Sequence, residues 1–402
     1  MHDLKKGGGA SGNRPRPLVE PDLSCYDTDA DEHEYIEELA RLDQADARHF
    51  LNVGVDAGES RRTGTFIQKD KSVIHCKAKQ PGVDILSITQ AMERFDWLDQ
   101  YMWKGVSPDK DEYTRWAMDR PTEGYFIRSH EGVQVDAPVQ ACLYIARERF
   151  SQNVHNVVIA EPGSTLHIIT GCTTAPHLVS GLHVGVSEFY VKKGAKLMFT
   201  MIHEWGEEVN VRPRTVGFVE EGGVFVSNYI SLRPVGSLQM APTTYLQGEG
   251  AVARFQSVLV ASQDSNLDVG GTVVLEAPDT RAEIISRAIT YGGNIMARGK
   301  LVGKVPEVRA HLECKGLILK DGLMQAVPEL EAWVPGVEMS HEAAVGKIDK
   351  GEIEYLMARG LTEEEAVSTI VRGFLNVDIE GLPAELRERL DKVIQETEKD
   401  MF

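Results

Sequence analysis

One cysteine and a histidine–glutamate pair are spaced in a way that suggests a metal site. Cys314 lies in the strand-like segment Ala310–Gly316, and His341 and Glu342 follow later in the chain. Cys314 and Glu342 are 28 residues apart. Thiolate, imidazole and carboxylate ligands together suit iron, an iron–sulfur cluster or zinc. The residues alone also allow a buried cysteine acting as a small apolar side chain, with His341 and Glu342 exposed at a strand end.

Cys172 is a second candidate for chemistry. It follows Gly171 and precedes polar turn residues, at a point where a strand gives way to a loop, so we expect an accessible thiol. A half-buried structural cysteine is the alternative. His203-Glu204-Trp205 invites comparison with the zinc metalloprotease helix motif but lacks the second histidine at the fourth following position. His341 fails the same test because position 345 is valine.

Composition excludes several classes of function. The 402 residues carry 43 Lys+Arg against 61 Asp+Glu, a net charge of −18, which argues against nucleic acid and anionic membranes as partners. No apolar run approaches the roughly 18 residues of a spanning helix. The five cysteines form no C-x-x-C pair, which favours reduced thiols. The first residues lack the apolar stretch of a secretory signal, so we expect a cytoplasmic protein with a flexible tail over residues 1–30.

A repeat dominates the middle of the chain. Short β-rich segments are separated by turn-type pairs that begin at Gly163, Gly194, Gly222, Gly250, Asp279 and Pro306, giving steps of 31, 28, 28, 29 and 27 residues. Such a step is typical of a solenoid, whose units bury an apolar face by stacking. With no helices between the strands, the pattern predicts a mainly β protein with a parallel β-helix over residues 121–335. A propeller and a β-sandwich are the alternatives.

Helical patterns flank this core. Apolar spacing predicts helices over Asp31–Gln44 and Leu86–Trp103 within an N-terminal helical region, residues 31–120. Between them, Phe50–Val83 indicates connecting structure or a small exposed subregion. In the C-terminal region, residues 336–402, Thr362 and Glu365 form a capping box before an apolar stripe, and Pro383 opens another predicted helix.

Three segments together resemble the SufB/SufD family of iron–sulfur cluster assembly scaffolds of the SUF system. The strongest is similar to the family's HEA-type motif, its R-G-[IL]-x-E-E-x-A run and its G-F helix, and comprises Ser340–Asp349, Arg359–Ala366 and Ile370–Phe374. The second, Glu161–Pro176, resembles the SufB stretch that ends in G-C-T-A-P. The third is Cys314 in its strand. The resemblance covers roughly residues 100 to 395.

This resemblance implies a right-handed parallel β-helix and a role in building a transient iron–sulfur cluster with a SufC-type ATPase, docked by the C-terminal helices. It implies that Cys314 and Glu342 hold the nascent cluster, with His341 where SufD supplies a functional histidine. Cys172 matches a proposed persulfide acceptor of SufB. His203 and Trp205 fall where SufB lines a proposed sulfur-transfer tunnel, although His203 replaces the usual glutamine.

The chain combines SufB-like and SufD-like features, so we expect a homodimer through the β-helix ends that receives sulfur from a donor and passes the cluster to apo-protein acceptors. The chain would then be a scaffold and not an enzyme. A flavin would be compatible with this chemistry but has no motif here. Two alternatives remain: a carbohydrate-active β-helix enzyme using Glu204, Glu207 and Glu208, and a structural adaptor that holds no cluster.

Overall fold

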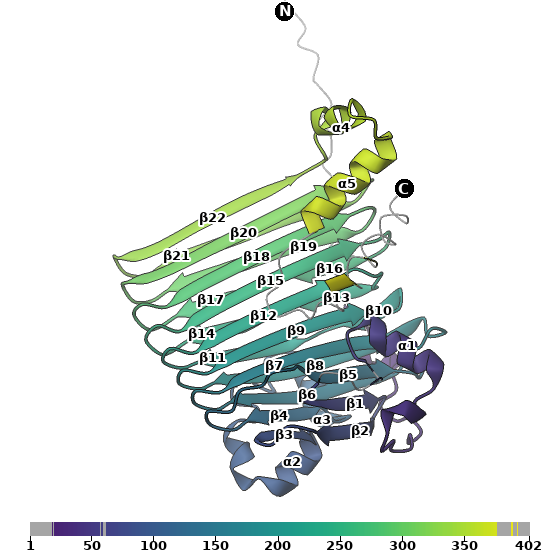
Figure 1. The fold of residues 1–402 in the computed structure, drawn as a ribbon, viewed down its shortest axis with the longest axis vertical. Coiled ribbons are helices and arrows are strands. Elements are labelled where there is room, and N and C mark those ends of the chain that lie inside the picture. Colours follow the sequence, from purple (N-terminus) through teal and green to yellow (C-terminus); the bar gives the residue numbers. More distant parts are fainter. Residues whose placement is uncertain are drawn as a thin grey trace, which may run out of the picture.

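The structure is a computed structural model that describes residues 18, 20–56, 58, 62–375, 387, 388 and 392. It is a parallel β-solenoid of about eight turns with a few helices at its ends, as Figure 1 shows, which confirms the predicted fold class. All pairings between successive turns are parallel; β1–β2 and β3–β4 are antiparallel.

Two sheets form the walls of the solenoid. The ten-stranded sheet contains, in spatial order, β2 (Ser72–Ala78), β1 (Gly64–Lys69), β5 (Val139–Ile145), β7 (Thr165–Thr174), β9 (Lys196–Glu204), β12 (Val224–Ser231), β15 (Val252–Ala261), β18 (Arg281–Thr290), β20 (Val308–Ile318) and β22 (Val337–Gly346). The twelve-stranded sheet contains β10 (Glu208–Val211), β13 (Ser237–Met240), β16 (Asn266–Val269), β19 (Asn294–Gly303), β17 (Thr272–Leu275), β14 (Thr243–Leu246), β11 (Arg214–Val219), β8 (Ser180–Val191), β6 (Ser151–Ala160), β4 (Tyr125–Ser129) and β3 (Val83–Ser87), with β21 (Leu323–Ala332) paired to β19.

A column of left-handed turn residues sets the repeat. Gly163, Gly194, Gly222 and Gly250 have φ values between 63° and 69°. The column continues through Asp279 (φ 55°), Glu307 (φ 63°) and Gly336 (φ 85°). Each of these amides up to Glu307 donates a hydrogen bond to a carbonyl of the next turn, as from Gly222 to Glu249 at 2.8 Å. The turns therefore stack on one another as the strands do.

The core lies between the two sheets. Inward-facing side chains stack in columns along the solenoid axis, for example Leu166, Leu197, Phe225, Ala253, Ala282 and Ala310, all of them buried. Between the two sheets, the ring centroids of Phe189 and Phe199 lie 4.8 Å apart. This burial of apolar surface is the main stabilising term of the fold.

The N-terminal region is less helical than predicted. Residues 31–43 are largely irregular, with one 3₁₀ turn (Leu39–Arg41), so the helix predicted over Asp31–Gln44 is wrong. The segment lies along the edge of β2 instead, where the Ile36 amide bonds the Ile74 carbonyl at 2.7 Å. Residues 50–83 also differ from the prediction of connecting structure, since they supply β1 and β2 to the ten-stranded sheet. Pairing with the sheet outweighs local helix propensity here.

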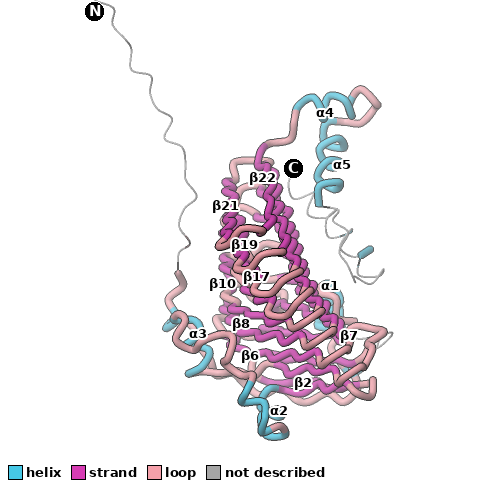
Figure 2. Tube along the Cα trace, turned by 90° about the vertical axis from the view of Figure 1, so that its left-hand side faces the viewer, coloured by secondary structure: helices cyan, strands magenta, loops and turns pink. Residues whose placement is uncertain are grey.

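The helices lie outside the solenoid (Figure 2). They are α1 (Gln44–Asn52), α2 (Ile88–Arg94) with the 3₁₀ helix Asp96–Gln100, α3 (Glu112–Asp119), α4 (Lys350–Met357) and α5 (Glu363–Leu375); a further 3₁₀ turn covers Leu23–Cys25. α2 and the following 3₁₀ helix occupy part of the predicted Leu86–Trp103 segment. Val53, which follows α1, and the buried side chains of α5 pack on the outer face of the ten-stranded sheet. Helix α3 packs on the outer face of the twelve-stranded sheet. No helix in the described ranges is long and apolar enough to cross a bilayer.

The C-terminal region begins later than residue 335, because β22 continues the solenoid to Gly346. The predicted capping box is present: the Thr362 amide donates to Glu365 Oε2 at 2.8 Å, and the Glu365 amide donates to Thr362 Oγ1 at 3.2 Å. Val371 and Leu375 of α5 are buried with outward-facing side chains of the ten-stranded sheet. Most of the helix predicted from Pro383, most of the tail predicted over residues 1–30, and residues 376–386 lie outside the described residues; residues 387, 388 and 392, which are described, are helical.

Replacing Gly250 by alanine should destabilise the solenoid by about 1 kcal/mol, because an L-residue in the left-handed region costs roughly 1–2 kcal/mol. A Cβ at Gly250 (φ 69°) would meet nothing within 4 Å, so only the backbone conformation is tested. Gly346→Ala is the matched control, since its Cβ also has open space and its φ lies outside the left-handed region. Urea denaturation measures both; equal midpoints for the two variants would contradict the role of the turn column.

Candidate functional site

Cys172 lies inside the solenoid. It is on β7, in register with Leu143 of β5 and His203 of β9, and its side chain belongs to the central core. The thiol is fully buried, so the accessible thiol predicted from the sequence is wrong for this conformation. The strand continues two residues beyond Cys172, and loop residues 175–179 then close this end of the turn.

A polar and aromatic cluster adjoins Cys172. His203 Nδ1 and the Tyr229 hydroxyl are hydrogen-bonded at 2.7 Å, while His203 Nε2 is buried without a hydrogen-bond partner. The Trp205 ring lies 5.3 Å from the His203 ring and 5.0 Å from that of His183. His203 and Trp205 were predicted to line an interior passage; the structure places His203 in register with Cys172 and the Trp205 ring against His203. Tyr229 and His183 were missed, because polar side chains on inward strand positions carry no sequence signal of their own.

Burial keeps this cluster uncharged at neutral pH. Removal from water lowers the pKa of His183 to about 3 and holds the pKa of His203 well below its ordinary value. The same desolvation raises the pKa of Cys172 far above that of an exposed thiol. Cys172 therefore stays a thiol and His203 a neutral imidazole while the interior remains closed.

The outer face behind Cys172 is sealed. A Cβ on Gly171 would lie 2.4 Å from Val53 Cγ2 and 2.6 Å from the Val53 carbonyl oxygen, so only glycine allows the chain after α1 to pack against β7. Cys142, in register with Gly171, is fully buried under the same segment. Access to Cys172 through this face is therefore blocked.

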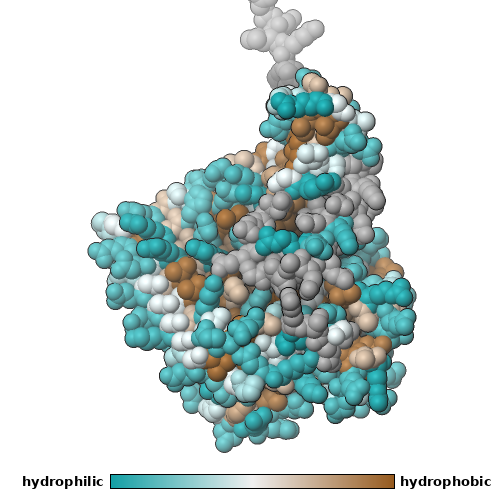
Figure 3. Space-filling model, in the orientation of Figure 1, coloured by the Kyte–Doolittle hydropathy of each residue, from teal (hydrophilic) through white to brown (hydrophobic). Residues whose placement is uncertain are grey.

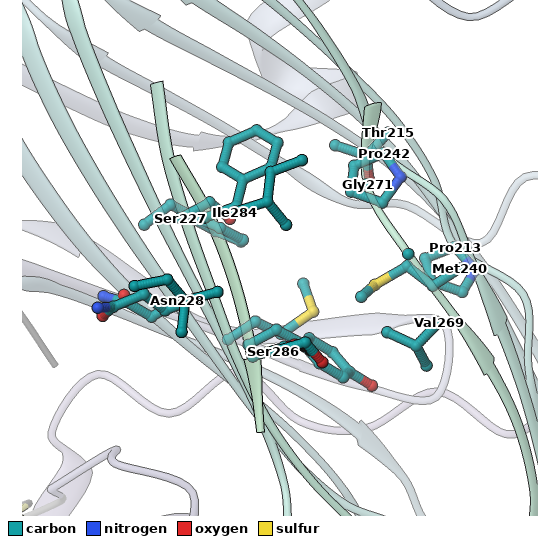
Figure 4. Close-up of a pocket in the computed structure, with 18 of the residues that line it drawn as sticks. Pro213, Thr215, Ser227, Asn228, Met240, Pro242, Val269, Gly271, Ile284 and Ser286 are labelled. Atoms are coloured by element: carbon teal, nitrogen blue, oxygen red, sulfur yellow. Dashed lines mark hydrogen bonds between the residues drawn. The ribbon is translucent and has the colours of Figure 1, made fainter. Parts of the chain in front are cut away.

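A cavity between the two sheets is lined by Tyr229 of this cluster and by residues of β9 to β19. Its volume is about 70 Å³, and Figure 4 shows Ser227, Ile284 and Ser286 on one side of it and Pro213, Met240 and Val269 on the other. Met201 and Tyr229 also line it, as does Ser257. Most of the lining is apolar, with hydroxyl groups along one wall.

Cys314 lies one strand beyond Ser286, the last hydroxyl residue of this wall. Parallel registers place Met201, Tyr229, Ser257, Ser286 and Cys314 in one column. Ser257 Oγ donates to Ser286 Oγ at 3.0 Å, and Cys314 is the next member after Ser286. Burial, with a smaller effect from Glu313, raises the pKa of Cys314 to about 11. Both predicted cysteines thus lie on inward-facing positions of the ten-stranded sheet.

The predicted set of Cys314, His341 and Glu342 does not assemble within one chain. Cys314 pairs in register with Ala343, whereas Glu342 pairs with Glu313 on the outer face. Lys315 Nζ joins Glu342 (3.0 Å) to Glu313 (3.2 Å) there. His341 is exposed and shares the face of Cys314, diagonally across from it. Within the described residues no three His, Cys, Asp or Glu side chains are grouped to hold a metal ion.

Comparison with known proteins fits this architecture. Residues 143–374 match the family described as SUF system FeS cluster assembly, SufBD core domain. The chain belongs to the SufBD family. An iron–sulfur cluster assembly SufBD family protein of Archaeoglobus fulgidus is 50% identical over 358 residues, which cover 89% of this chain and 96% of that relative. One from Methanothermobacter thermautotrophicus is 48% identical over 379 residues (93% and 92%), and one from Pyrococcus horikoshii is 31% identical over 340 residues (83% and 76%).

Membership of the SufBD family supports a role in iron–sulfur cluster assembly. It disfavours the carbohydrate-active alternative. The carboxylates named for that alternative are dispersed: Glu204 ends β9 and lies 3.9 Å from Arg233, while Glu208 begins β10 in the other sheet.

Acid should destabilise the fold through its buried histidines. The unfolded chain takes up protons below about pH 6.5, whereas folded His183 stays neutral down to about pH 3, so stability falls as pH falls between these values. From pH 7 to pH 5 the loss from His183 should be about 2 kcal/mol. His183→Asn keeps a donor for Gln152 Oε1 and should remove that loss. Urea titrations at both pH values measure it. Exposed His177→Asn is the control, and an unchanged pH dependence in His183→Asn would contradict the prediction.

Proposed function

We propose that this SufBD family protein is a scaffold subunit that accepts sulfur at Cys172 and assembles an iron–sulfur cluster at the end of the solenoid that carries Cys314, and that it is not itself an enzyme. The observation that supports this most directly is the row of inward-facing side chains that leads, strand by strand, from Cys172 to Cys314. It runs through the His203–Tyr229 hydrogen bond and then along the column of Ser257 and Ser286.

Sulfur acceptance is an exchange between the Cys172 thiol and a donor persulfide. The Cys172 sulfur attacks the terminal sulfur of a donor persulfide, the S–S bond of the donor breaks, and the donor leaves as a thiol while Cys172 becomes the persulfide. His203 takes the Cys172 proton, which ends on the departing donor sulfur. Burial disfavours the charged forms of both groups, so we propose that reaction follows movement of loop 175–179, which exposes the thiol.

Transfer to Cys314 requires a small carrier. Strands β9, β12, β15 and β18 lie between the two cysteines, so the thiols are separated by about 24 Å at a strand spacing of about 4.8 Å. Direct exchange between them is excluded at that distance. An external dithiol, becoming a disulfide, would supply two electrons and two protons to release the terminal sulfur as hydrogen sulfide. This small neutral molecule suits the apolar cavity between β9 and β18.

The cluster, as cargo, would be held at the open end of the solenoid. Cys314 and His341 share one face there, and Glu342 lies on the other. β22 is the terminal strand of the ten-stranded sheet, and most of its side chains are exposed. Such an edge favours pairing with another strand. We therefore propose a homodimer through this end, in which the second copy completes the ligand set. Few thiolate ligands would favour release of the cluster to an acceptor.

The C-terminal helices are the proposed dock for a SufC-type ATPase. Figure 3 shows apolar side chains gathered over α4 and α5, and the large exposed residues there include Tyr355 and Met357. ATP hydrolysis in the partner would then bias the arrangement of the helices that follow the cluster site. We place this assembly in the cytoplasm.

Cys172→Ser should abolish sulfur incorporation from a cysteine desulfurase donor while leaving chemical reconstitution with iron and sulfide largely intact. Cys142→Ser is the matched control, because Cys142 is equally buried in the neighbouring strand but faces outward. Radiolabelled sulfur uptake and visible absorbance measure the two reactions. Equal activity of Cys172→Ser in both assays would discard the acceptor role.

Cys314→Ala should abolish cluster formation in both assays and leave the solenoid folded, since alanine fits the column already occupied by Ala343. Anaerobic reconstitution, followed by iron and acid-labile sulfide analysis, tests this, with circular dichroism as the folding control. Undiminished visible absorbance would contradict the site. Binding of an ATPase without iron or sulfide uptake by the unmodified protein would instead favour the structural adaptor.

The purified chain should sediment as a dimer, and Ala343→Pro in β22 should convert it to a monomer because proline disrupts strand pairing. Sedimentation equilibrium measures the mass. An obligate complex with a different scaffold subunit, or a monomeric unmodified chain, would overturn the homodimer.

A further inference from the structure

Two arginines lie buried where β10 passes into β11, outside the twelve-stranded sheet. Arg212 is fully buried and Arg214 is 9% exposed. Both guanidinium groups lie over the ring of Tyr113 in α3, at 5.4 Å and 5.0 Å from its centroid. Fully buried arginines are normally paired, and their pairs with carboxylate or phosphate groups are frequently bidentate.

Not all the N–H groups of the Arg212 guanidinium have hydrogen-bond acceptors. Its Nη1 donates to the carbonyls of Val211 (3.1 Å) and Ser237 (3.3 Å). Its Nε reaches Glu20 Oε2 at 3.4 Å, and that oxygen also accepts from the Tyr113 hydroxyl. Nη2 is buried and has no hydrogen-bond partner. Because Nε and Nη2 lie along one edge of the guanidinium group, they match the two oxygens of a carboxylate or phosphate.

Positive charge exceeds negative charge around this edge, although the chain carries a net charge of −18. Arg214 bonds Asp111, which offsets one charge. Lys110 adds another cation, and burial together with the charge of Arg214 lowers its pKa. Glu20 is the carboxylate that contacts Arg212 in the described part of the chain, and 46% of its side chain is exposed to solvent. An incoming anion therefore competes with a single, half-exposed carboxylate.

We propose that Arg212 and Arg214 form a binding site for the carboxylate or phosphate group of a small anionic ligand, and that Glu20 occupies this site when the ligand is absent. The ligand displaces the Glu20 carboxylate and pairs with Nε and Nη2 of Arg212. Because the site lies outside the twelve-stranded sheet and the cysteines lie in the solenoid interior, the proposal does not depend on the role in cluster assembly.

Binding of inorganic phosphate and of acetate to the full chain tests the site at constant ionic strength set with sodium chloride. Glu20→Gln removes the competing charge, so it should bind one or both anions at least tenfold more tightly than the unmodified protein, as measured by thermal shift. A gain in affinity for phosphate alone would indicate a phosphate ligand. A gain for both phosphate and acetate would indicate a site that also accepts a carboxylate. Unchanged affinity for both anions in Glu20→Gln would overturn the proposal.

Arg214→Gln in the Glu20→Gln background should lose the gained affinity, whereas Arg281→Gln on the exposed outer face of the ten-stranded sheet should keep it. Line broadening of the phosphorus-31 resonance measures binding without reference to unfolding, which separates lost binding from lost stability. Equal broadening with the Arg214→Gln and Arg281→Gln variants would show an adventitious ion only and would also overturn the site.

Discussion

The parallel register between successive turns is the constraint on which the rest of the structure depends. Each residue is stacked on the one that lies one turn away, so residues about 28 or 29 positions apart share a column and a face. This stacking turns Ser257, Ser286 and Cys314 into one wall of an interior space. It also brings Cys172 beside His203. The chemistry of the interior follows from the registration of the strands and not from any local motif.

Burial makes the interior of the solenoid largely apolar and keeps its titratable groups uncharged. A stack of parallel strands satisfies its backbone through hydrogen bonds between turns, so the space between the sheets can be largely apolar. Thiol and imidazole groups in that space are held neutral because the charged forms lose their hydration. The Cys172 thiol is therefore shielded from solvent.

The sequence predicted the architecture well, because its signals are local. Four glycines at a near-constant step mark positions that need a left-handed backbone, and the capping box at Thr362 is a four-residue pattern. The site was predicted less well. A step of 28 would have placed Glu342 beside Cys314, but the actual step is 29, and one residue of slip moves a side chain to the opposite face. The helix prediction over residues 31–43 was wrong for a related reason, because the pairing of this segment with β2 depends on residues far away in the sequence.

The two non-glycine residues in the column of turns have a mechanical consequence. Asp279 and Glu307 hold a left-handed backbone that costs an L-residue free energy, and both lie in the half of the solenoid that ends at β22. That terminal coil is bonded along one edge alone, whereas every interior coil is bonded along two. In an array held by nearest neighbours, fraying therefore begins at this end and propagates inward. The turn that carries His341 is thus the first to lose its strand pairing, whereas the turns around Cys172 are hydrogen-bonded to a neighbouring turn on both sides.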